Sequence, residues 1–345
     1  MRRRVITAVA MLVALTAVVA SCGSDSRTEG PAAAASSEPT TVRLGYFPNI
    51  THATAILGVD QGIFAEALGR DRLETTTFNA GPAATEALLS KAIDAAYIGP
   101  SPTVNAWAKS KAITIISGAT SGGAALVVKP SITTAAQLKG KKLATPQLGN
   151  TQDVALRHWL KEQGLASDPS GGGDVAITPQ ENSQTLDSFK AGDIDGAWVP
   201  EPWATRLVQE GGGRVLVDEK DLWPGGKFVS THLVVRTEFL QRHPEAVSRL
   251  LKGQIEANEF INANTEKAQT IVNDAIGELT GKPLRLETIK TAWSNLTFTN
   301  DPAVASLSTS AAHAVDVGLL KSVDLDGIYD LAPLNALLEQ AVPTS

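Results

Sequence analysis

Short apolar segments with the character of strands alternate with amphipathic, helix-like segments along most of this chain. This alternation constrains the fold more than any other feature, because strands separated by helices form α/β sheets whose strands are mainly parallel. The first series has strands at 42–47, 73–78, 95–98 and 113–117, and helices at 53–67, 83–93 and 104–110.

A second series of the same kind follows, and residues 90–96 and 189–197 share a pattern in which a helix end runs into a strand. Single hydrophobic cores rarely grow beyond about 250–300 residues, so the folded part is expected to form two lobes. The second series has strands at 142–144, 175–178, 196–199 and 214–217, and helices at 154–163, 183–191 and 204–210.

The chain is expected to pass between the lobes near 127–129 and again near 230–233. A helical tail from Glu238 onward would then return to the first lobe. The predicted division is therefore 41–127 with 232–345 for lobe 1, and 128–231 for lobe 2.

The N-terminus has the pattern of an export signal. Three arginines, Arg2 to Arg4, precede an apolar run over 5–19, which is shorter than the 20 or so residues that span a bilayer. The closing Val-Ala-Ser-Cys resembles the lipobox of bacterial lipoproteins, which implies cleavage and lipidation at Cys22. The alternative for a lone cysteine is a small buried side chain.

Residues 23–40 contain no large apolar side chain, so they are expected to form a flexible tether between the signal peptide (1–22) and the folded body. These features predict an exported protein that is held at the outer face of the cell membrane through a lipid anchor only. Cys22 is the only cysteine, so no disulfide can form within the chain. We expect a monomer.

The formal net charge of −6 argues against a nucleic-acid partner, which requires clustered Lys and Arg. The sequence also lacks the Gly-x-Ser-x-Gly and Gly-x-Gly-x-x-Gly motifs, and its glycine triplets are not followed by Lys-Ser/Thr. No catalytic residue or cofactor is therefore predicted. No metal site is predicted either, because the five histidines do not have the spacing of metal ligands. They are His52, His158, His232, His243 and His313.

Ligands of open α/β sheets bind beyond the carboxyl ends of the strands, where helix N-termini present free N–H groups. Six turns at such positions combine Asn, Ser, Thr, Pro or Gly with aromatic residues. Ordinary helix capping would explain any one of them, but the set predicts a ligand site. The turns are 46–52, 79–82, 99–103, 121–124, 147–152 and 198–203.

Several motifs occur in an order that resembles the substrate-binding proteins of sulfonate, nitrate and taurine ABC importers. The resemblance covers about 41–299 and implies a type II periplasmic-binding fold, in which two α/β lobes joined by two crossovers close on one small ligand. It also implies a membrane permease and an ATPase as partners. The motifs are V-R-L-G-Y-F-P-N-I-T-H-A, D-Q-G-I-F, A-A-Y-I-G-P-S-P, L-K-G-K-K-L-A-T-P-Q-L-G-N-T-Q-D and A-W-V-P-E-P-W.

The same resemblance implies a set of cleft positions, all of which lie in the six turns. They are Tyr46, Phe47, Asn49, Thr51, His52, Gly81, Ser101, Ser121, Gly122, Gly123, Gln147, Asn150, Thr151, Trp198, Glu201 and Trp203.

None of the six turns contains Lys or Arg, which suits a singly charged sulfonate held by neutral groups. The resemblance associates nitrate and bicarbonate binding with a basic residue. The aromatic residues favour an organic ligand, with burial in the lobe cores as the alternative. Glu201 has a structural role at a helix start, or binds a ligand ammonium such as that of taurine if it faces the cleft.

Other functions remain open at this point. One is an enzyme on the same fold, of the pyrimidine-precursor or menaquinone-pathway type. Another is a binder of nitrate or of a thiamine precursor, and the last is a structural or adhesion lipoprotein.

Overall fold

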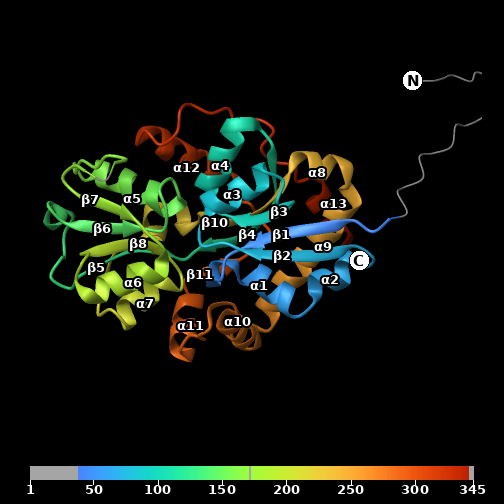
Figure 1. Cartoon of the computed structure of the whole chain (residues 1–345), viewed down its shortest axis with the longest axis horizontal. Helices are drawn as coiled ribbons and strands as arrows, with labels where there is room; N and C mark the ends of the chain where they lie inside the picture. Colours follow the sequence, from blue (N-terminus) through green and yellow to red (C-terminus); the bar gives the residue numbers. More distant parts are fainter. Residues whose placement is uncertain (1–37, 171, 342–345) are drawn as a thin grey trace, which may run out of the picture. The chain divides into compact units, whose positions relative to one another are not determined.

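Two mixed β-sheets, each covered by helices on both faces, organise the folded body in this computed structural model (Figure 1). The structure describes residues 38–170 and 172–341, all of which except Glu38 belong to one unit, 39–345. The predicted signal peptide, the lipidation site Cys22 and tether residues 23–37 lie outside the described residues.

The six-stranded sheet defines lobe 1. Its strands, in spatial order, are β11 (Leu296–Phe298), β4 (Ile113–Gly122), β10 (Val229–Arg236), β3 (Ala95–Ile98), β1 (Thr41–Tyr46) and β2 (Arg72–Thr77). The five-stranded sheet defines lobe 2. Its strands, in spatial order, are β7 (Ala176–Pro179), β6 (Lys142–Thr145), β8 (Gly196–Pro200), β5 (Ala124–Val128) and β9 (Arg214–Asp218).

Both sheets combine parallel and antiparallel pairs. The strands that are separated by helices pair in parallel, as predicted: β1 with β2 and β3, and β6 with β7 and β8. The remaining pairs are antiparallel: β10 with β3 and β4, β11 with β4, and β5 with β8 and β9. The prediction of mainly parallel sheets is therefore wrong. Strands β4, β5, β9 and β10, which flank the crossovers, form antiparallel pairs, and such pairs do not need the helical connection that a parallel pair requires.

The first crossover lies at Gly123. Strand β4 ends in the sheet of lobe 1 at Gly122, and β5 begins in the sheet of lobe 2 at Ala124. The sequence predicts this passage near 127–129. The earlier position follows from the backbone, because Gly122 and Gly123 have φ values of +83° and +75°, a region that side chains other than glycine rarely adopt.

The return crossover lies between β9 and β10, in a segment that contains two 3₁₀ helices, η3 (Glu219–Leu222) and η4 (Pro224–Gly226). The sequence places it near 230–233, but those residues are already in strand β10 of lobe 1. Lobe 2 therefore spans 124–218, rather than the predicted 128–231. Two lobes and two crossovers are present, as predicted.

Helices of the first half of lobe 1 follow the predicted positions except for 53–67, which is interrupted at Gly62, where φ is +70°. These elements are η1 (Ile50–His52), α1 (Ala53–Asp60), α2 (Ile63–Leu68), α3 (Gly81–Leu89) and α4 (Pro100–Ser110). Lobe 2 contains η2 (Ala135–Leu138), α5 (Thr151–Glu162), α6 (Asn182–Ala191) and α7 (Trp203–Gln209).

The C-terminal helices return to lobe 1, as predicted. Helix α9 packs on α1 and α2, α10 packs on α1, and α12 packs on α4. The helices of this part are α8 (Thr237–Arg242), α9 (Pro244–Ala263), α10 (Thr265–Thr280), α11 (Leu286–Trp293), α12 (Val304–Asp316) and α13 (Ala332–Ala341). Across 38–170 and 172–341, every helix is too short or too polar to cross a membrane.

Candidate ligand-binding cleft

A small cavity lies where helix starts from the two lobes meet, and we call it the inner cavity. Its volume is about 20 Å³. Lobe 1 contributes Phe47, Asn49, Thr51, His52, Asn79, Ala80, Gly99 and Ser230, and lobe 2 contributes Pro146, Asn150, Thr151, Gln152, Asn182 and Pro200.

Four helices begin at this cavity, because each follows the carboxyl end of a strand. The residues immediately before α3, α4 and α5, namely Ala80, Gly99 and Asn150, line the cavity, and so does Asn182, the first residue of α6. In the described structure none of these four helix starts receives a hydrogen bond from a capping side chain. Their first N–H groups and the positive ends of their dipoles therefore remain available to an anion.

Buried polar atoms without partners also gather at these helix starts. Ser101 Oγ in the first turn of α4, Thr151 Oγ1 in the first turn of α5 and Asn182 Oδ1 have no hydrogen-bond partner among the described residues. Each of these residues is at most 7% exposed. Leaving a buried polar group unpaired costs about 1–3 kcal/mol, and such groups are rare in native proteins. Their presence on both lobes indicates a polar ligand.

The inner cavity has no fixed charge, since Lys, Arg, Asp and Glu are missing from the described residues that line it. His52 faces the cavity, and burial lowers its pKa to about 3, so the ring is neutral at pH 7. The imidazole lies 4.2 Å from the Phe47 ring between centroids, and Nδ1 accepts a 3.4 Å hydrogen bond from the Phe47 N–H. Any anion here would be held by neutral donors.

A wider outer cavity of about 450 Å³ adjoins the inner one and shares Asn79, Ala80 and Pro146 with it. Gln147 Oε1 and Gln180 Nε2 on its wall have no partner within the described part of the chain. Glu181 is exposed and accepts a 2.7 Å hydrogen bond from Asn79 Nδ2 of the other lobe.

The lobes are in contact around the inner cavity. Trp203 Nε1 of lobe 2 donates a 2.9 Å hydrogen bond to Asn49 Oδ1 of lobe 1. A Cβ atom at Gly99 would collide with Thr151 Oγ1, so only glycine allows these two helix starts to approach so closely. The lobes are therefore closed on each other in this structure, which explains the small volume of the inner cavity.

The predicted residues Phe47, Asn49, Thr51, His52, Asn150 and Thr151 all line the inner cavity, and Gln147 lines the outer one. Gly81, Ser101 and Trp203 are not among the residues that line the inner cavity. Gly81 and Ser101 lie in the first turns of α3 and α4, and Trp203 donates a hydrogen bond to the lining residue Asn49. Asn150 does not cap its helix, since its Nδ2 donates a 3.1 Å hydrogen bond to Gln152 Oε1.

Two predicted aromatic residues lie in the lobe cores instead of the cleft. Tyr46 packs in the core of lobe 1, on the opposite face of the strand from Phe47, because successive side chains of a strand alternate in direction. Trp198 is fully buried within β8, and its Nε1 donates a 2.7 Å hydrogen bond to Glu219 Oε2. This corrects their assignment to the site and supports the alternative of core burial.

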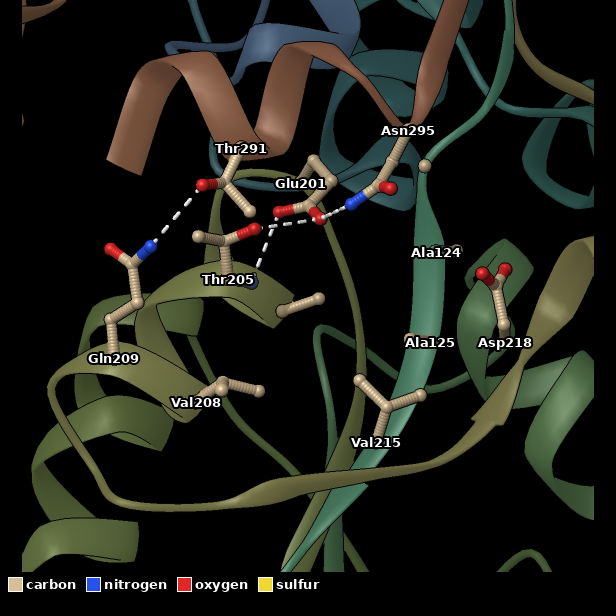
Figure 2. A pocket seen from close by; sticks show the side chains of 12 residues that line it. Ala124, Ala125, Glu201, Thr205, Val208, Gln209, Val215, Asp218, Thr291 and Asn295 are labelled. Carbon is tan, nitrogen blue, oxygen red and sulfur yellow. Dashed lines mark hydrogen bonds between the residues drawn. The ribbon is translucent and has the colours of Figure 1, made fainter. Parts of the chain in front are cut away.

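The predicted turn 121–124 and Glu201 also lie outside the inner cavity. Ser121 Oγ donates a 2.6 Å hydrogen bond to the Phe228 carbonyl, and Gly122 and Gly123 form the crossover. Glu201 lines a third cavity beside that crossover (Figure 2). Ser121, Gly122, Gly123 and Glu201 therefore lie at the crossover, which is the hinge between the lobes, and do not line the inner cavity.

Sequence reasoning missed Pro146, Asn182, Ser230 and Gln180. The turn rule could have found Asn182, since it stands between the predicted strand 175–178 and the predicted helix 183–191. Ser230 lies within a strand, so the rule that site residues follow strand ends could not have found it. Its Oγ donates a 2.6 Å hydrogen bond to the Gly122 carbonyl. Within 38–170 and 172–341 no group of three or more His, Cys, Asp or Glu side chains is placed to hold a metal.

Two α/β lobes joined by two crossovers around one small polar cavity define a periplasmic-binding-protein fold. The alkanesulfonate-binding protein SsuA from Xanthomonas axonopodis pv. citri, solved with bound MOPS, has this fold. It superimposes with a TM-score of 0.72 at 19% sequence identity, over 86% of this chain and 99% of that one. The predicted fold class is confirmed.

The chain belongs to the NMT1-like family, whose model matches residues 35–275. A protein of Brucella abortus (strain 2308) described as a binding protein is 31% identical over 234 residues, 67% of this chain and 70% of that protein. The taurine-binding periplasmic protein of Escherichia coli (strain K12) is 31% identical over 194 residues, 55% of this chain and 57% of that protein. Both relatives are named as binding proteins, in agreement with the prediction of a binding protein rather than an enzyme.

Proposed function

We propose that this chain is an exported, lipid-anchored protein that captures a small organic monoanion and delivers it to the permease and ATPase of an ABC importer. The proposed ligand is an alkane- or arylsulfonate, or taurine. The observation that carries the proposal is the inner cavity, where four uncapped helix starts meet around the unpaired Thr151 hydroxyl and the described lining residues include no basic side chain.

The charges favour a monoanion over a dianion. Each helix start acts as roughly half a positive charge at short range, and no lysine or arginine among the described lining residues adds to it. Glu181 beside the outer cavity would repel further negative charge. A single anionic head in the inner cavity is consistent with this field, and the 450 Å³ outer cavity has room for an organic tail.

Binding would require the lobes to separate and then close. About 10–15 Å³ holds one water molecule, so the inner cavity of about 20 Å³ is too small for a sulfonate group. The chain passes between the lobes at two crossovers, and glycines at 122 and 123 give the first one conformational freedom. Hinge closure around a ligand would bring Ser101 of lobe 1 and Thr151 of lobe 2 onto the same anion.

The relatives support a small anion as the ligand, and they include proteins named for bicarbonate and nitrate as well as for sulfur compounds. One is named for taurine and one solved neighbour is named for alkanesulfonates. Export is supported by the N-terminal pattern of Arg2 to Cys22 and by the periplasmic location in the name of the taurine relative. Nitrate fits this cavity less well, because the described lining residues include no cation.

A thermal-shift screen tests the ligand class with alkane- and arylsulfonates, taurine, nitrate, sulfate and a thiamine precursor. A ligand at a hundredfold excess over its Kd stabilises the folded state by about 2.7 kcal/mol. We expect the sulfonates or taurine to raise the melting temperature and nitrate and sulfate to leave it unchanged. Stabilisation by nitrate alone, or by the thiamine precursor alone, would replace the sulfonate assignment. Isothermal titration then measures the affinity of the best ligand.

A further inference from the structure

The third cavity, of about 210 Å³, lies beside the crossover at Gly123 and shares no lining residue with the inner or outer cavity (Figure 2). We call it the hinge cavity. Its walls are largely apolar, with Ala124 and Ala125 from β5, Val208 from α7 and Val215 from β9. Such a surface suits a short hydrocarbon chain.

Residues of both lobes line the hinge cavity. Lobe 2 contributes β5, α7 and β9, and lobe 1 contributes Thr291 of α11 and Asn295. Gln209 joins the lobes at the rim, since its Oε1 accepts a 2.6 Å hydrogen bond from Thr288 Oγ1. A molecule in this cavity would therefore contact both lobes at the hinge.

Glu201 is a buried carboxylate on the wall of the hinge cavity, only 2% exposed. Its Oε1 accepts hydrogen bonds from Thr205 Oγ1 (2.9 Å) and Asn295 Nδ2 (2.7 Å), and its Oε2 accepts one from the Thr205 N–H (3.1 Å). A carboxylate offers about four acceptor positions, so one position on Oε2 is left.

No cation balances this carboxylate. Glu201 takes part in none of the ion pairs of the described residues, and burial raises its pKa. Asp218 is a second carboxylate on the wall, and its ion pair with Lys220 lies at 2.8 Å. Lys, Arg and His do not occur among the described residues that line the cavity. The cavity therefore disfavours anions and favours a positively charged guest.

We propose that the hinge cavity binds a small primary alkylammonium ion, with an N–H group donated to Glu201 Oε2 and the alkyl chain against Val208 and Val215. The charge would neutralise the buried carboxylate, and the chain would cover apolar walls that now face solvent. Because the cavity includes residues from both lobes, an occupant that binds the open and closed arrangements with different affinity would also change the affinity of the cleft for its own ligand, and the cleft ligand would change amine affinity by the same factor.

The probe is n-butylammonium chloride, with n-butanol as a neutral compound of similar shape, titrated calorimetrically into the folded protein. We expect the ammonium ion to bind at least tenfold more tightly than the alcohol. Glu201→Gln removes the charge and should weaken ammonium binding at least tenfold. Equal affinity for the two probes, or no ammonium binding tighter than about 10 mM, would overturn the proposal and leave Glu201 as a buried hydrogen-bond acceptor only.

A second variant covers the case in which Glu201→Gln does not fold. Val215 is 44% exposed, so Val215→Phe can fill the cavity without disturbing the Glu201 hydrogen bonds. This variant should fold normally and lose ammonium binding at least tenfold. Exposed Leu286→Phe, on α11 but outside the cavity lining, is the matched control and should bind as the parent protein does. Unchanged ammonium affinity in Val215→Phe would place the amine elsewhere.

Discussion

Thr151→Val separates a ligand contact from a structural contact at the inner cavity. Valine keeps the branched shape of threonine and removes only the hydroxyl. Thr151 Oγ1 is buried and has no partner among the described residues, so its removal takes no hydrogen bond from the folded, ligand-free protein. The ligand-free variant should therefore be at least as stable as the parent protein.

Thr151→Val should change stability and ligand affinity in opposite directions. An unpaired buried polar group costs about 1–3 kcal/mol, so the free energy of unfolding should rise by up to that amount when the hydroxyl is removed. A hydrogen bond to a charged ligand contributes about 1.5–3 kcal/mol, which corresponds to a roughly 10- to 150-fold loss of affinity. Urea unfolding of the ligand-free protein measures the first effect, and isothermal titration with the best sulfonate measures the second.

Thr103→Val, in α4 on the opposite side of the cleft, is the matched control. Thr103 Oγ1 is fully buried but donates a 2.8 Å hydrogen bond to the Gly99 carbonyl. This substitution should lower stability by about 0.5–1.5 kcal/mol and change ligand affinity less than threefold. If Thr151→Val lowered stability and left affinity unchanged, the hydroxyl would be structural, and the reasoning from unpaired atoms would fail.

Four further predictions concern protonation and the anchor. Burial raises the pKa of Glu219 from 4.5 to about 7, so ionisation of this residue should lower stability by up to about 3 kcal/mol as pH rises from 4.5 to 7. Urea unfolding at several pH values should therefore give a different dependence of stability on pH for the parent protein and for Glu219→Gln. Identical pH profiles would contradict this prediction. His52, His232 and His313 have pKa values lowered to about 3, 4 and 4, so the folded state binds fewer protons, and stability should fall as pH drops from 6.5 towards these values. Since His52 is neutral, ligand affinity should stay constant between about pH 5 and 9, and a large drop above pH 6.5 would show that a protonated ring holds the anion. Cys22→Ser should move the protein from the membrane fraction to the soluble fraction at an unaltered melting temperature, and membrane retention would refute lipid anchoring.

Local patterns in the sequence were sufficient to predict the two α/β lobes and the turns that build the cleft. Strand and helix periods are properties of short segments, and Gly, Pro, Asn and Thr mark helix starts wherever they follow a strand. These patterns predicted the turns, and the family resemblance implied the individual residues within them; Asn49, Thr51, His52, Asn150 and Thr151 do line the inner cavity.

The directions of side chains depended on the tertiary structure. Tyr46 and Phe47 are neighbours with similar character, but only Phe47 faces the cavity, since the pairing of β1 decides which face of the sheet each side chain covers. Glu201 and Trp203 stand two residues apart, yet Glu201 lines the hinge cavity while Trp203 contacts Asn49 of the other lobe.

Long-range pairing also decided the crossovers and the last members of the site. The sequence predicts a turn at 121–124, but it could not show that strand pairing changes from one sheet to the other at Gly123. Ser230 comes to the inner cavity only because β10 pairs with β3 and β4 in lobe 1. These features depend on hydrogen bonds between segments about a hundred residues apart, whereas the strands, helices and turns depend on residues that are close together in the chain.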